Sequence, residues 1–290
     1  MLSRRAILSL PFGALAQSAY PVIDIHQHTP YSGRTADQLV AHQRSMGITR
    51  TVLLPAGSKY ELAAGAGGND TVIELARRYP NEYRFFANEL PDIPETKKVI
   101  EKYLKAGAIG IGEQKFPVEC DSKAMQLVAG IAQHHGVPVL MHFQHGTYNL
   151  GFERFYKLVE RFPKVNFIGH AQTWWGNIDK NHQQEVMYPK GPVTPGGITD
   201  RLLSDYPNVY GDLSAGSGLN ALVRDEDHAR DFLKRHQDRL IYGSDCSDRD
   251  GTGQGCSGSQ QLAVVRRLAP DEQAVRKMLS LNAAKVMRVE

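Results

Sequence analysis

Short apolar runs alternate with longer stretches of mixed polarity from residue 20 to the end of the chain. The apolar runs predict β-strands, which we place at residues 22–25, 51–54, 83–87, 108–111, 137–141, 165–169, 209–212 and 240–243. The stretches between them carry apolar residues at helical spacing. They predict helices near residues 35–46, 70–79, 95–105, 122–135, 152–162, 198–206, 221–235 and 259–268, and a last helix at 271–287.

This alternation predicts a particular α/β fold. Strands that alternate with helices form parallel sheets, because each helix carries the chain back to the start of the next strand. Eight such units favour a closed (β/α)₈ TIM barrel in a single domain, residues 20–290. The alternative is an open doubly wound sheet, which carries a glycine-rich phosphate-binding turn after its first strand. Here the first strand is followed by His26, Gln27 and His28 instead.

The first 19 residues differ from the rest of the chain. Arg4 and Arg5 precede an uncharged run at residues 6–16, which ends in Ala14-Leu15-Ala16. This pattern is typical of a signal peptide and resembles a twin-arginine export signal, so we expect a periplasmic or secreted protein. If residues 1–19 are only an N-terminal arm, we expect a cytoplasmic protein. The run is too short to span a bilayer, and no cysteine follows the cleavage site to carry a lipid anchor.

Composition narrows the classes of partner. The chain has 290 residues, 41% of them hydrophobic and 22% charged, as expected of a globular protein. Lys and Arg number 34 and Asp and Glu 31, and a net charge of +3 is too small to indicate nucleic-acid or membrane binding. We therefore expect a small-molecule substrate, no nucleic acid and no membrane anchor. A homo-oligomer remains open.

Metal-compatible side chains lie at the ends of several predicted strands. His26 and His28 are two residues apart, so on a strand both imidazoles face the same side. Four more such residues end the fourth, fifth, sixth and eighth strands, respectively Glu113, His142, His170 and Asp245. The carboxyl ends of barrel strands meet at one mouth, where TIM barrels carry their chemistry. The six residues together therefore predict a divalent-metal site.

At this point the sequence resembles the amidohydrolase superfamily. The resemblance rests on the HxH pair, on Glu113, on the two later histidines and on Asp245. Further phrases are similar to its amidohydrolase-related branch, which includes relatives of aminocarboxymuconate-semialdehyde decarboxylase. These phrases are FIGHA at 167–171, YGSD at 242–245 and LNAAK at 281–285. The resemblance implies a metal-dependent (β/α)₈ enzyme, most often a hydrolase.

Ligand chemistry supports the same expectation. Imidazole and carboxylate ligands suit zinc, with manganese or iron as alternatives, and one or two ions fit the set. A bound ion lowers the pKa of its water to about 7, so metal-bound hydroxide can attack an amide, ester or lactone bond of a small molecule. Asp245 is then both ligand and general base, and His170 either binds the ion or polarises the substrate. In two-metal relatives a carboxylate at the position of Glu113 bridges the ions, and this residue favours hydrolysis. The alternatives are a non-oxidative decarboxylase on the same site and a catalytically silent binding barrel.

Other residues carry weaker expectations. Lys115, His145 and Trp174 are candidate substrate-binding residues, and Trp174 lies with Trp175 in a long insertion after the sixth strand. Either tryptophan would close the mouth or pack locally. Asp212 ends the seventh strand and could support the site through a hydrogen bond. Five histidines fall on predicted helices and are interpreted as surface or helix-end residues: His42, His134, His135, His228 and His236.

Cysteine placement suggests one further feature. None of the three cysteines forms a CxxC pair, which excludes a zinc ribbon. Cys246 and Cys256 lie ten residues apart on the loop after the eighth strand, and Cys246 follows Asp245 directly. In an exported protein these two could form a disulfide that restrains the loop carrying Asp245, leaving Cys120 as the free thiol. Three reduced cysteines are the alternative.

Overall fold

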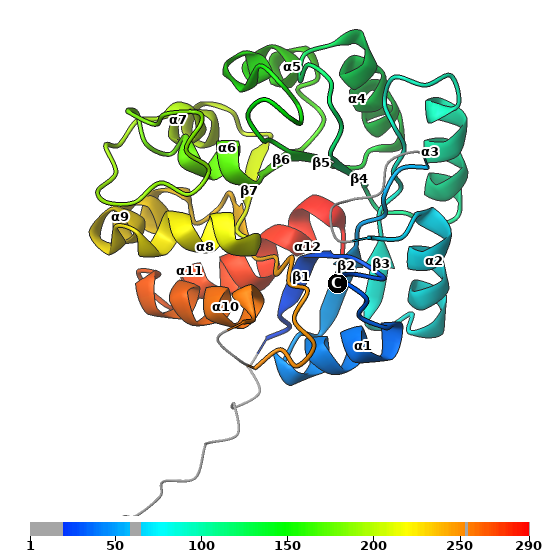
Figure 1. The fold of residues 1–290 in the computed structure, drawn as a ribbon, viewed down its shortest axis with the longest axis horizontal. Helices are drawn as coiled ribbons and strands as arrows, with labels where there is room; N and C mark the ends of the chain where they lie inside the picture. The colour runs from blue at the N-terminus through cyan, green and yellow to red at the C-terminus, as the bar shows by residue number, and fades with distance from the viewer. Residues whose placement is uncertain (1–19, 59–64, 253–254, 290) are drawn as a thin grey trace, which may run out of the picture.

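The fold is seen in a computed structural model, which describes residues 20–58, 65–252 and 255–289. Within these residues eight parallel strands alternate with helices. Figure 1 shows the strands arranged in a ring, with most of the helices around it. The strands are β1 (Ile23–Gln27), β2 (Arg50–Leu53), β3 (Tyr83–Phe85), β4 (Ile111–Gln114), β5 (Val139–His142), β6 (Phe167–His170), β7 (Val209–Asp212) and β8 (Leu240–Ile241). The predicted export signal, residues 1–19, lies outside the described residues.

Hydrogen bonds join the strands into a closed ring. Regular ladders run through β1-β2-β3 and through β4-β5-β6-β7-β8. One seam between these sheets is bridged where Ala87 pairs with Ile111 and the Gly112 amide donates to the Ala87 carbonyl at 2.9 Å. At the other seam, the Ile25 amide donates to the Tyr242 carbonyl at 3.2 Å. The fold is therefore a single-domain TIM barrel, as predicted.

The helices follow the strands in the expected order. They are α1 (Ala36–Ser45), α2 (Asn69–Arg78), α3 (Thr96–Lys105), α4 (Lys123–His135), α5 (Phe155–Arg161), α6 (Gln172–Gly176), α7 (Ile198–Asp205), α8 (Ala215–Val223), α9 (Glu226–His236), α10 (Ser257–Leu268), α11 (Glu272–Arg276) and α12 (Asn282–Met287). A 3₁₀ turn, η1 (Phe152–Arg154), precedes α5, and a π-helical turn, η2 (Lys277–Leu281), joins α11 to α12. Several helices begin at side chains suited to capping, such as Thr35, which accepts from the Gln38 amide before α1.

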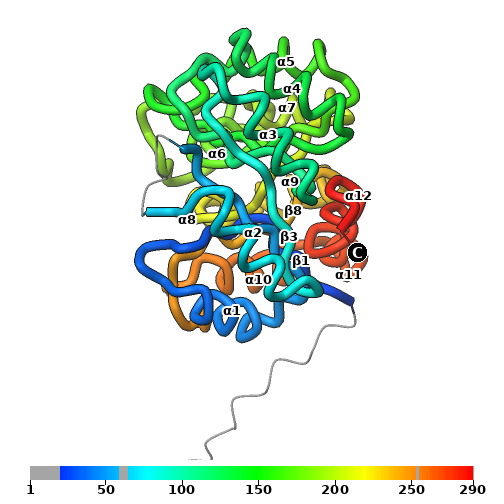
Figure 2. The backbone as a smooth tube through the Cα atoms, turned by 90° about the vertical axis from the view of Figure 1, so that its right-hand side faces the viewer, coloured from blue at the N-terminus to red at the C-terminus, as the bar shows by residue number. Residues whose placement is uncertain are grey.

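Two apolar layers hold the barrel together. The outward faces of the strands pack against the helices in one large core. The inward faces form a smaller cluster, to which α12 contributes Ala283, Val286 and Met287. Figure 2 shows α12 and the described chain ends on one side of the molecule, and the loops after β1 and β2 on the opposite side. Helix α12 thus fills the barrel at the end away from those loops.

Some boundaries differ from the sequence predictions. The fourth strand was predicted at 108–111 but lies at Ile111–Gln114. The prediction stopped at the end of the apolar run, whereas the strand continues through polar residues that are buried. The predicted helix at 221–235 is two helices, since Asp225 caps a new one by accepting from the His228 amide. Helix α6 lies in the insertion where no helix was predicted. His42 and His228 are buried, which corrects their interpretation as surface or helix-end residues. His236 is the last residue of α9, so its interpretation as a helix-end residue is confirmed, although it is buried as well.

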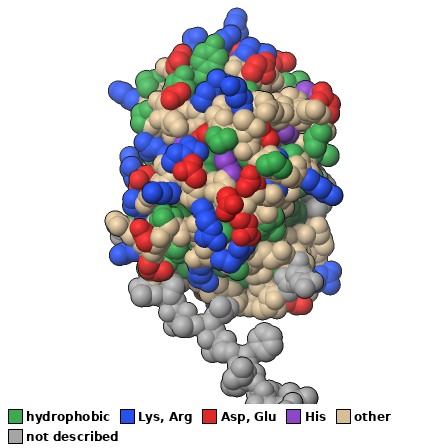
Figure 3. All heavy atoms as spheres, turned by 90° about the vertical axis from the view of Figure 1, so that its left-hand side faces the viewer, with side chains coloured by type: hydrophobic (Ala, Val, Ile, Leu, Met, Phe, Trp, Pro, Cys, Tyr) green, Lys and Arg blue, Asp and Glu red, His purple; other side chains and the backbone are tan. Residues whose placement is uncertain are grey.

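The molecular surface agrees with the small net charge. On the face shown in Figure 3, basic and acidic side chains are interspersed, and neither kind gathers into a broad patch. Among the described residues, no helix is both long enough and apolar enough to cross a membrane.

Candidate metal centre

The structure brings together the six residues that the sequence singled out. His26 lies in β1, Glu113 in β4, His142 in β5 and His170 in β6. His28 follows β1, and Asp245 follows β8. The parallel strands point the same way, so all six side chains meet at the carboxyl-terminal mouth of the barrel.

The HxH pair has the geometry of two ligands to one ion. The Nε2 atoms of His26 and His28 lie 3.1 Å apart, and both side chains are buried. The Nδ1–H of His28 donates to the Leu54 carbonyl at 2.8 Å, and Nδ1 of His26 lies 2.6 Å from Asp212 Oδ2. With Nδ1 occupied by these partners, each ring presents its Nε2 lone pair toward the centre.

Asp245 reaches the same centre from the opposite end of the chain. Its Oδ1 lies 3.5 Å from His28 Nε2 and 3.8 Å from His26 Nε2, and its Oδ2 lies 3.6 Å from His170 Nε2. Its backbone has φ of 40°, a left-handed conformation that is uncommon for a residue with a side chain. At 14% exposed, this carboxylate is more open than the three imidazoles around it.

Glu113 sits between the imidazoles. Its Oε2 lies 3.6 Å from His28 Nε2 and 3.8 Å from His26 Nε2. Its Oε1 lies 3.8 Å from His170 Nε2 and 2.5 Å from His142 Nδ1. One oxygen therefore faces the HxH pair and the other faces the histidines of β5 and β6, an arrangement suited to a bridging carboxylate.

At the mouth, two sets of donor atoms among the described residues are each compact enough to hold an ion. They are His26, His28 and Asp245, and His26, Glu113 and His170, with all atoms in each set within 4.8 Å of one another. Donors bound at about 2.1 Å to one ion are separated by roughly 3.0–3.5 Å, close to the distances observed. His142 belongs to neither set, and its Nδ1 lies 2.5 Å from Glu113 Oε1.

The ionisation of the two carboxyl groups at the centre also suits a bound cation. Burial by itself would favour neutral Glu113 and Asp245, but nearby positive charges and hydrogen-bond donors hold the pKa of both carboxyls well below their ordinary value. For Glu113 these groups are chiefly Lys115 and His142, and for Asp245 chiefly His26. Burial lowers the pKa of His142 to about 4, so this ring is neutral at physiological pH. Buried carboxylates beside imidazoles are a donor set that fits a divalent ion.

Hydrogen bonds from neighbouring residues fix the ligands. Asp212 accepts from His26 and, at 2.9 Å, from the Ser214 hydroxyl. That hydroxyl lies 3.0 Å from Nδ1 of His170, which leaves Nε2 of His170 turned toward the centre. Sequence reasoning raised Asp212, whose position at a strand end was the signal, but it missed Ser214.

Two further polar residues were missed. The Tyr31 hydroxyl donates to Asp245 Oδ1 at 2.9 Å. Asn149 donates to the carbonyls of Gln114 and His142 at 2.6 and 2.8 Å, which ties the ends of β4 and β5 together. Neither residue adjoins a predicted strand end, so no local pattern marks it.

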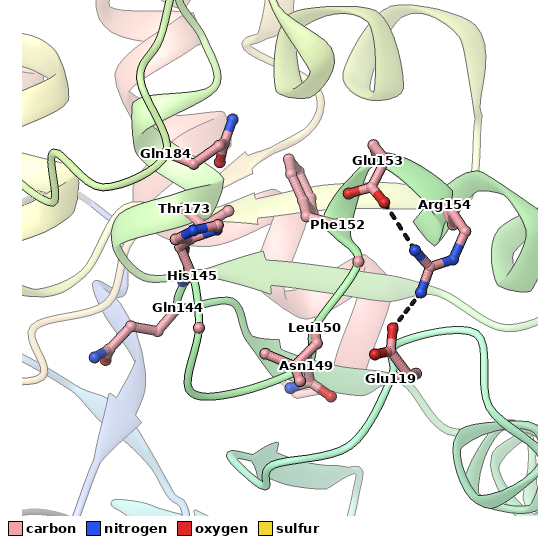
Figure 4. A pocket seen from close by; sticks show the side chains of 12 residues that line it. Glu119, Gln144, His145, Asn149, Leu150, Phe152, Glu153, Arg154, Thr173 and Gln184 are labelled. Atoms are coloured by element: carbon pink, nitrogen blue, oxygen red, sulfur yellow. Dashed lines mark hydrogen bonds and ion pairs between the residues drawn. The ribbon is translucent and has the colours of Figure 1, made fainter.

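The three candidate substrate-binding residues have different surroundings. Lys115 is half-buried, with its Nζ 5.7 Å from the centre of the Tyr148 ring. His145 is 49% exposed and lines a cavity of about 330 Å³ beside the mouth. Figure 4 shows Gln144, His145, Thr173 and Gln184 on one side of this cavity and the Glu119–Arg154–Glu153 ion pairs on the other.

Trp174 lies elsewhere. It is 0% exposed and packs against Phe143 and Phe152, with ring centres 6.0 and 5.8 Å apart. It therefore has no surface to offer a substrate, which corrects the expectation of a substrate contact. Trp175 is also buried, and its indole N–H donates to the Asp212 carbonyl at 2.9 Å. Both tryptophans pack locally and do not form a lid.

Solved structures share this architecture. An uncharacterised TIM-barrel protein of Bordetella bronchiseptica superposes with a TM-score of 0.67 at 15% identity, covering 93% of this chain and 99% of that one. A probable 2-pyrone-4,6-dicarboxylic acid hydrolase of Acinetobacter baumannii gives 0.62 at 13% identity, with coverage of 93% and 100%. A 2,6-dihydroxybenzoate decarboxylase from Rhizobium gives 0.56 at 13% identity, with coverage of 92% and 98%. At these identities the likeness concerns the fold.

Sequence comparison supplies the family. No curated protein matches the chain significantly. A family model described as amidohydrolase matches residues 23–289, from the first strand of the barrel to its closing helix. The chain therefore belongs to the amidohydrolase family.

Proposed function

We propose that the protein is a metal-dependent hydrolase that cleaves an amide, ester or lactone bond of a small molecule. The proposal rests on one observation above others. Asp245 is the partly exposed member of an otherwise buried donor set, within 3.8 Å of the Nε2 atoms of His26, His28 and His170. A carboxylate so placed can bind an ion and also meet a substrate entering from the mouth.

The residues to hold an ion are His26, His28, Glu113, His170 and Asp245, with His142 behind Glu113. A divalent ion here, zinc first and manganese or iron as alternatives, would lower the pKa of coordinated water to about 7. The two oxygens of Glu113 face different imidazoles, so the set accommodates one ion or two.

The chain's own groups supply the proton chemistry. Tyr31 donates to Oδ1 of Asp245, which leaves Oδ2, the oxygen nearer His170, free to accept a proton as general base. Ser214 and Asp212 hold the rings of His170 and His26, so neither imidazole can rotate away from the centre. The cavity beside His145 is at the small end of the range for small-molecule pockets, and we assign it to the substrate.

Lys115 favours a second candidate reaction, non-oxidative decarboxylation. A non-oxidative decarboxylase needs a cation to hold the substrate carboxylate, and Lys115 stands close enough to Glu113 to lower its pKa. A solved structure with the same fold is a 2,6-dihydroxybenzoate decarboxylase. We rank hydrolysis first because the two oxygens of Glu113 face different imidazoles. This placement would suit a second ion, which mononuclear decarboxylation does not require.

The test compares metal-free and reconstituted protein. The protein is stripped with a chelator, reloaded with zinc, manganese or ferrous iron, and assayed on lactones, esters, amides and aromatic carboxylates, with released CO₂ measured. We expect metal-dependent hydrolysis without CO₂. Release of CO₂ would establish the decarboxylase, and loaded protein without turnover would favour the silent barrel.

The matching variant is Asp245→Asn. Loss of the general base should lower kcat by about 10²–10⁴-fold. Asp250→Asn, an exposed change on the same loop, is the control and should retain full activity. Full activity of Asp245→Asn would contradict the mechanism.

A further inference from the structure

A second group of metal-binding side chains lies behind the loop that carries Asp245. It consists of His42 and Met46 at the end of α1, Cys246 after β8, and Cys256 at the start of α10. All four side chains are buried. The Cys256 Sγ lies 3.2 Å from Cys246 Sγ, 3.4 Å from His42 Nε2 and 3.6 Å from Met46 Sδ.

The three strongest donors have the dimensions of a metal site. The two sulfurs and the His42 nitrogen all lie within 4.8 Å of one another. With separations of this size, a point in their plane lies within roughly 2.4 Å of all three, close to the metal–thiolate distance of about 2.3 Å. The ion would therefore fit with little movement of the side chains.

The donor types differ from those at the barrel mouth. The mouth offers imidazoles and carboxylates, whereas this group offers two thiols, one imidazole and a nearby thioether. Thiolate and thioether sulfur select soft cations, Cu(I) above all, and Zn(II) is bound well by thiolate and imidazole. We therefore expect the two sites to prefer different ions.

We propose that His42, Cys246 and Cys256 bind one thiophilic cation, Zn(II) or Cu(I), with the Met46 thioether in reach as a ligand for Cu(I). Binding releases the two thiol protons to solvent, and no oxidation state changes. A disulfide between Cys246 and Cys256, one of the two alternatives that the sequence left open, would need an oxidant and would leave the buried His42 ring without a role.

The ion would fix the loop after β8. Cys246 follows Asp245, and its carbonyl already accepts from Arg34 Nη1 at 2.7 Å and from Gln27 Nε2 at 3.0 Å. A metal bond to the Cys246 side chain would hold the same residue from its other side. The proposal does not depend on the reaction at the mouth.

The test titrates Cd(II) into reduced, metal-free, full-length protein. Cadmium bound to thiolate absorbs in the near ultraviolet, and the mouth has no thiolate among its candidate ligands. We expect this absorption to saturate at one cadmium per chain. Cys256→Ser should abolish it, and Cys120→Ser, which removes a buried cysteine from another part of the barrel, should leave it unchanged.

Two measurements on the wild-type chain protect the test from a misfolded variant. X-ray absorption of the cadmium-loaded protein should show sulfur neighbours, and thiol titration should show Cys246 and Cys256 protected by the ion. Because a thioether is a ligand for Cu(I) and is not needed by Zn(II), Met46→Leu should weaken Cu(I) binding and leave Zn(II) binding unchanged. Absence of thiolate absorption, or isolation of the two cysteines as a disulfide, would overturn the proposal.

Discussion

Asp212 shows how a residue outside the ligand set can control the site. It accepts a hydrogen bond from His26 and one from Ser214, which in turn holds His170. A carboxylate behind a ligating imidazole orients the ring and increases its basicity. Asp212 therefore acts on two candidate ligands at once, although it reaches the centre only through them.

Asp212→Asn tests this role. We expect metal affinity to fall by about 10–100-fold, because the amide keeps the shape but loses the negative charge. Competition with a chromogenic chelator measures the change. Asp238→Asn, at an exposed carboxylate paired with Lys277, is the control. Equal affinity in both variants would remove Asp212 from the site.

Two substitutions of Trp174 distinguish a role in packing from a role in substrate binding. Trp174→Ala should destabilise the fold by about 3–5 kcal/mol, since it removes a fully buried aromatic side chain. Trp174→Phe should cost less and should leave KM unchanged, because the buried side chain has no exposed surface for a substrate to contact. Urea unfolding and steady-state kinetics give the two quantities. A raised KM in Trp174→Phe with unchanged stability would restore the substrate contact.

Site residues could be predicted from the sequence where their position at the end of a strand determines their neighbours. The candidate ligands end apolar runs, so barrel topology alone brings them to one mouth. Tyr31 and His42 were missed because a loop and a distant helix decide their partners, Asp245 and Cys256. A buried histidine on a helix has the same local pattern as an exposed one, and only packing distinguishes them.

Among the elements, α7 and α9 are joined by polar contacts around the buried Asp200. Asp200 of α7 lies 2.6 Å from His236 Nε2 and accepts from Arg235 Nη1 at 2.6 Å, both on α9. Burial favours the neutral acid, but these two partners and the Gly196 amide outweigh it and depress the pKa of Asp200. These contacts therefore stabilise the fold only while Asp200 is ionised.

The pH dependence follows from this direction. The folded pKa lies below the unfolded value of 3.8, so the stabilisation is complete above that pH and is lost as pH falls through the folded pKa. Asp200→Asn should lower the free energy of unfolding by about 2 kcal/mol at pH 7. The difference in the free energy of unfolding between the variant and the wild type should become smaller below about pH 4. Urea midpoints measured from pH 7 to pH 3 check both statements, and a difference independent of pH would contradict them.

Element order was predictable, and element ends were less so. Hydrophobic periodicity places all eight strands, but β4 extends past its apolar run because Asn88 and Asn149 bind the carbonyls of Glu113 and Gln114. Helix α6 is short and its two tryptophans are buried, so it lacks the one-sided apolar stripe that identifies a surface helix.

For the whole molecule, the seam between β1 and β8 decides whether the barrel closes. Asp24 of β1 is fully buried there. It accepts from the Ser244 amide at 2.9 Å, from the His26 amide at 3.0 Å and from Gln43 Nε2 at 3.0 Å. This carboxylate thus ties the first strand to the loop after the last one.

Asp24→Ala should destabilise the protein by more than about 3 kcal/mol, because it leaves several buried donors unpaired. Asp37→Ala, at a 72% exposed carboxylate paired with Arg78, should cost less than about 1 kcal/mol. Denaturant unfolding followed by tryptophan fluorescence compares them. Equal costs for the two variants would show that the seam does not depend on Asp24.

The same seam brings residues that follow the first and the last strand of the barrel into one candidate metal centre. His26 and His28 emerge early in synthesis, whereas Asp245 is added after most of the barrel has been made. The His26–His28–Asp245 donor set therefore forms only in a nearly complete chain whose first and last strands have met. Metal choice in a cell depends on availability as well as on affinity. An ion bound at the mouth would then be drawn from the compartment where folding finishes.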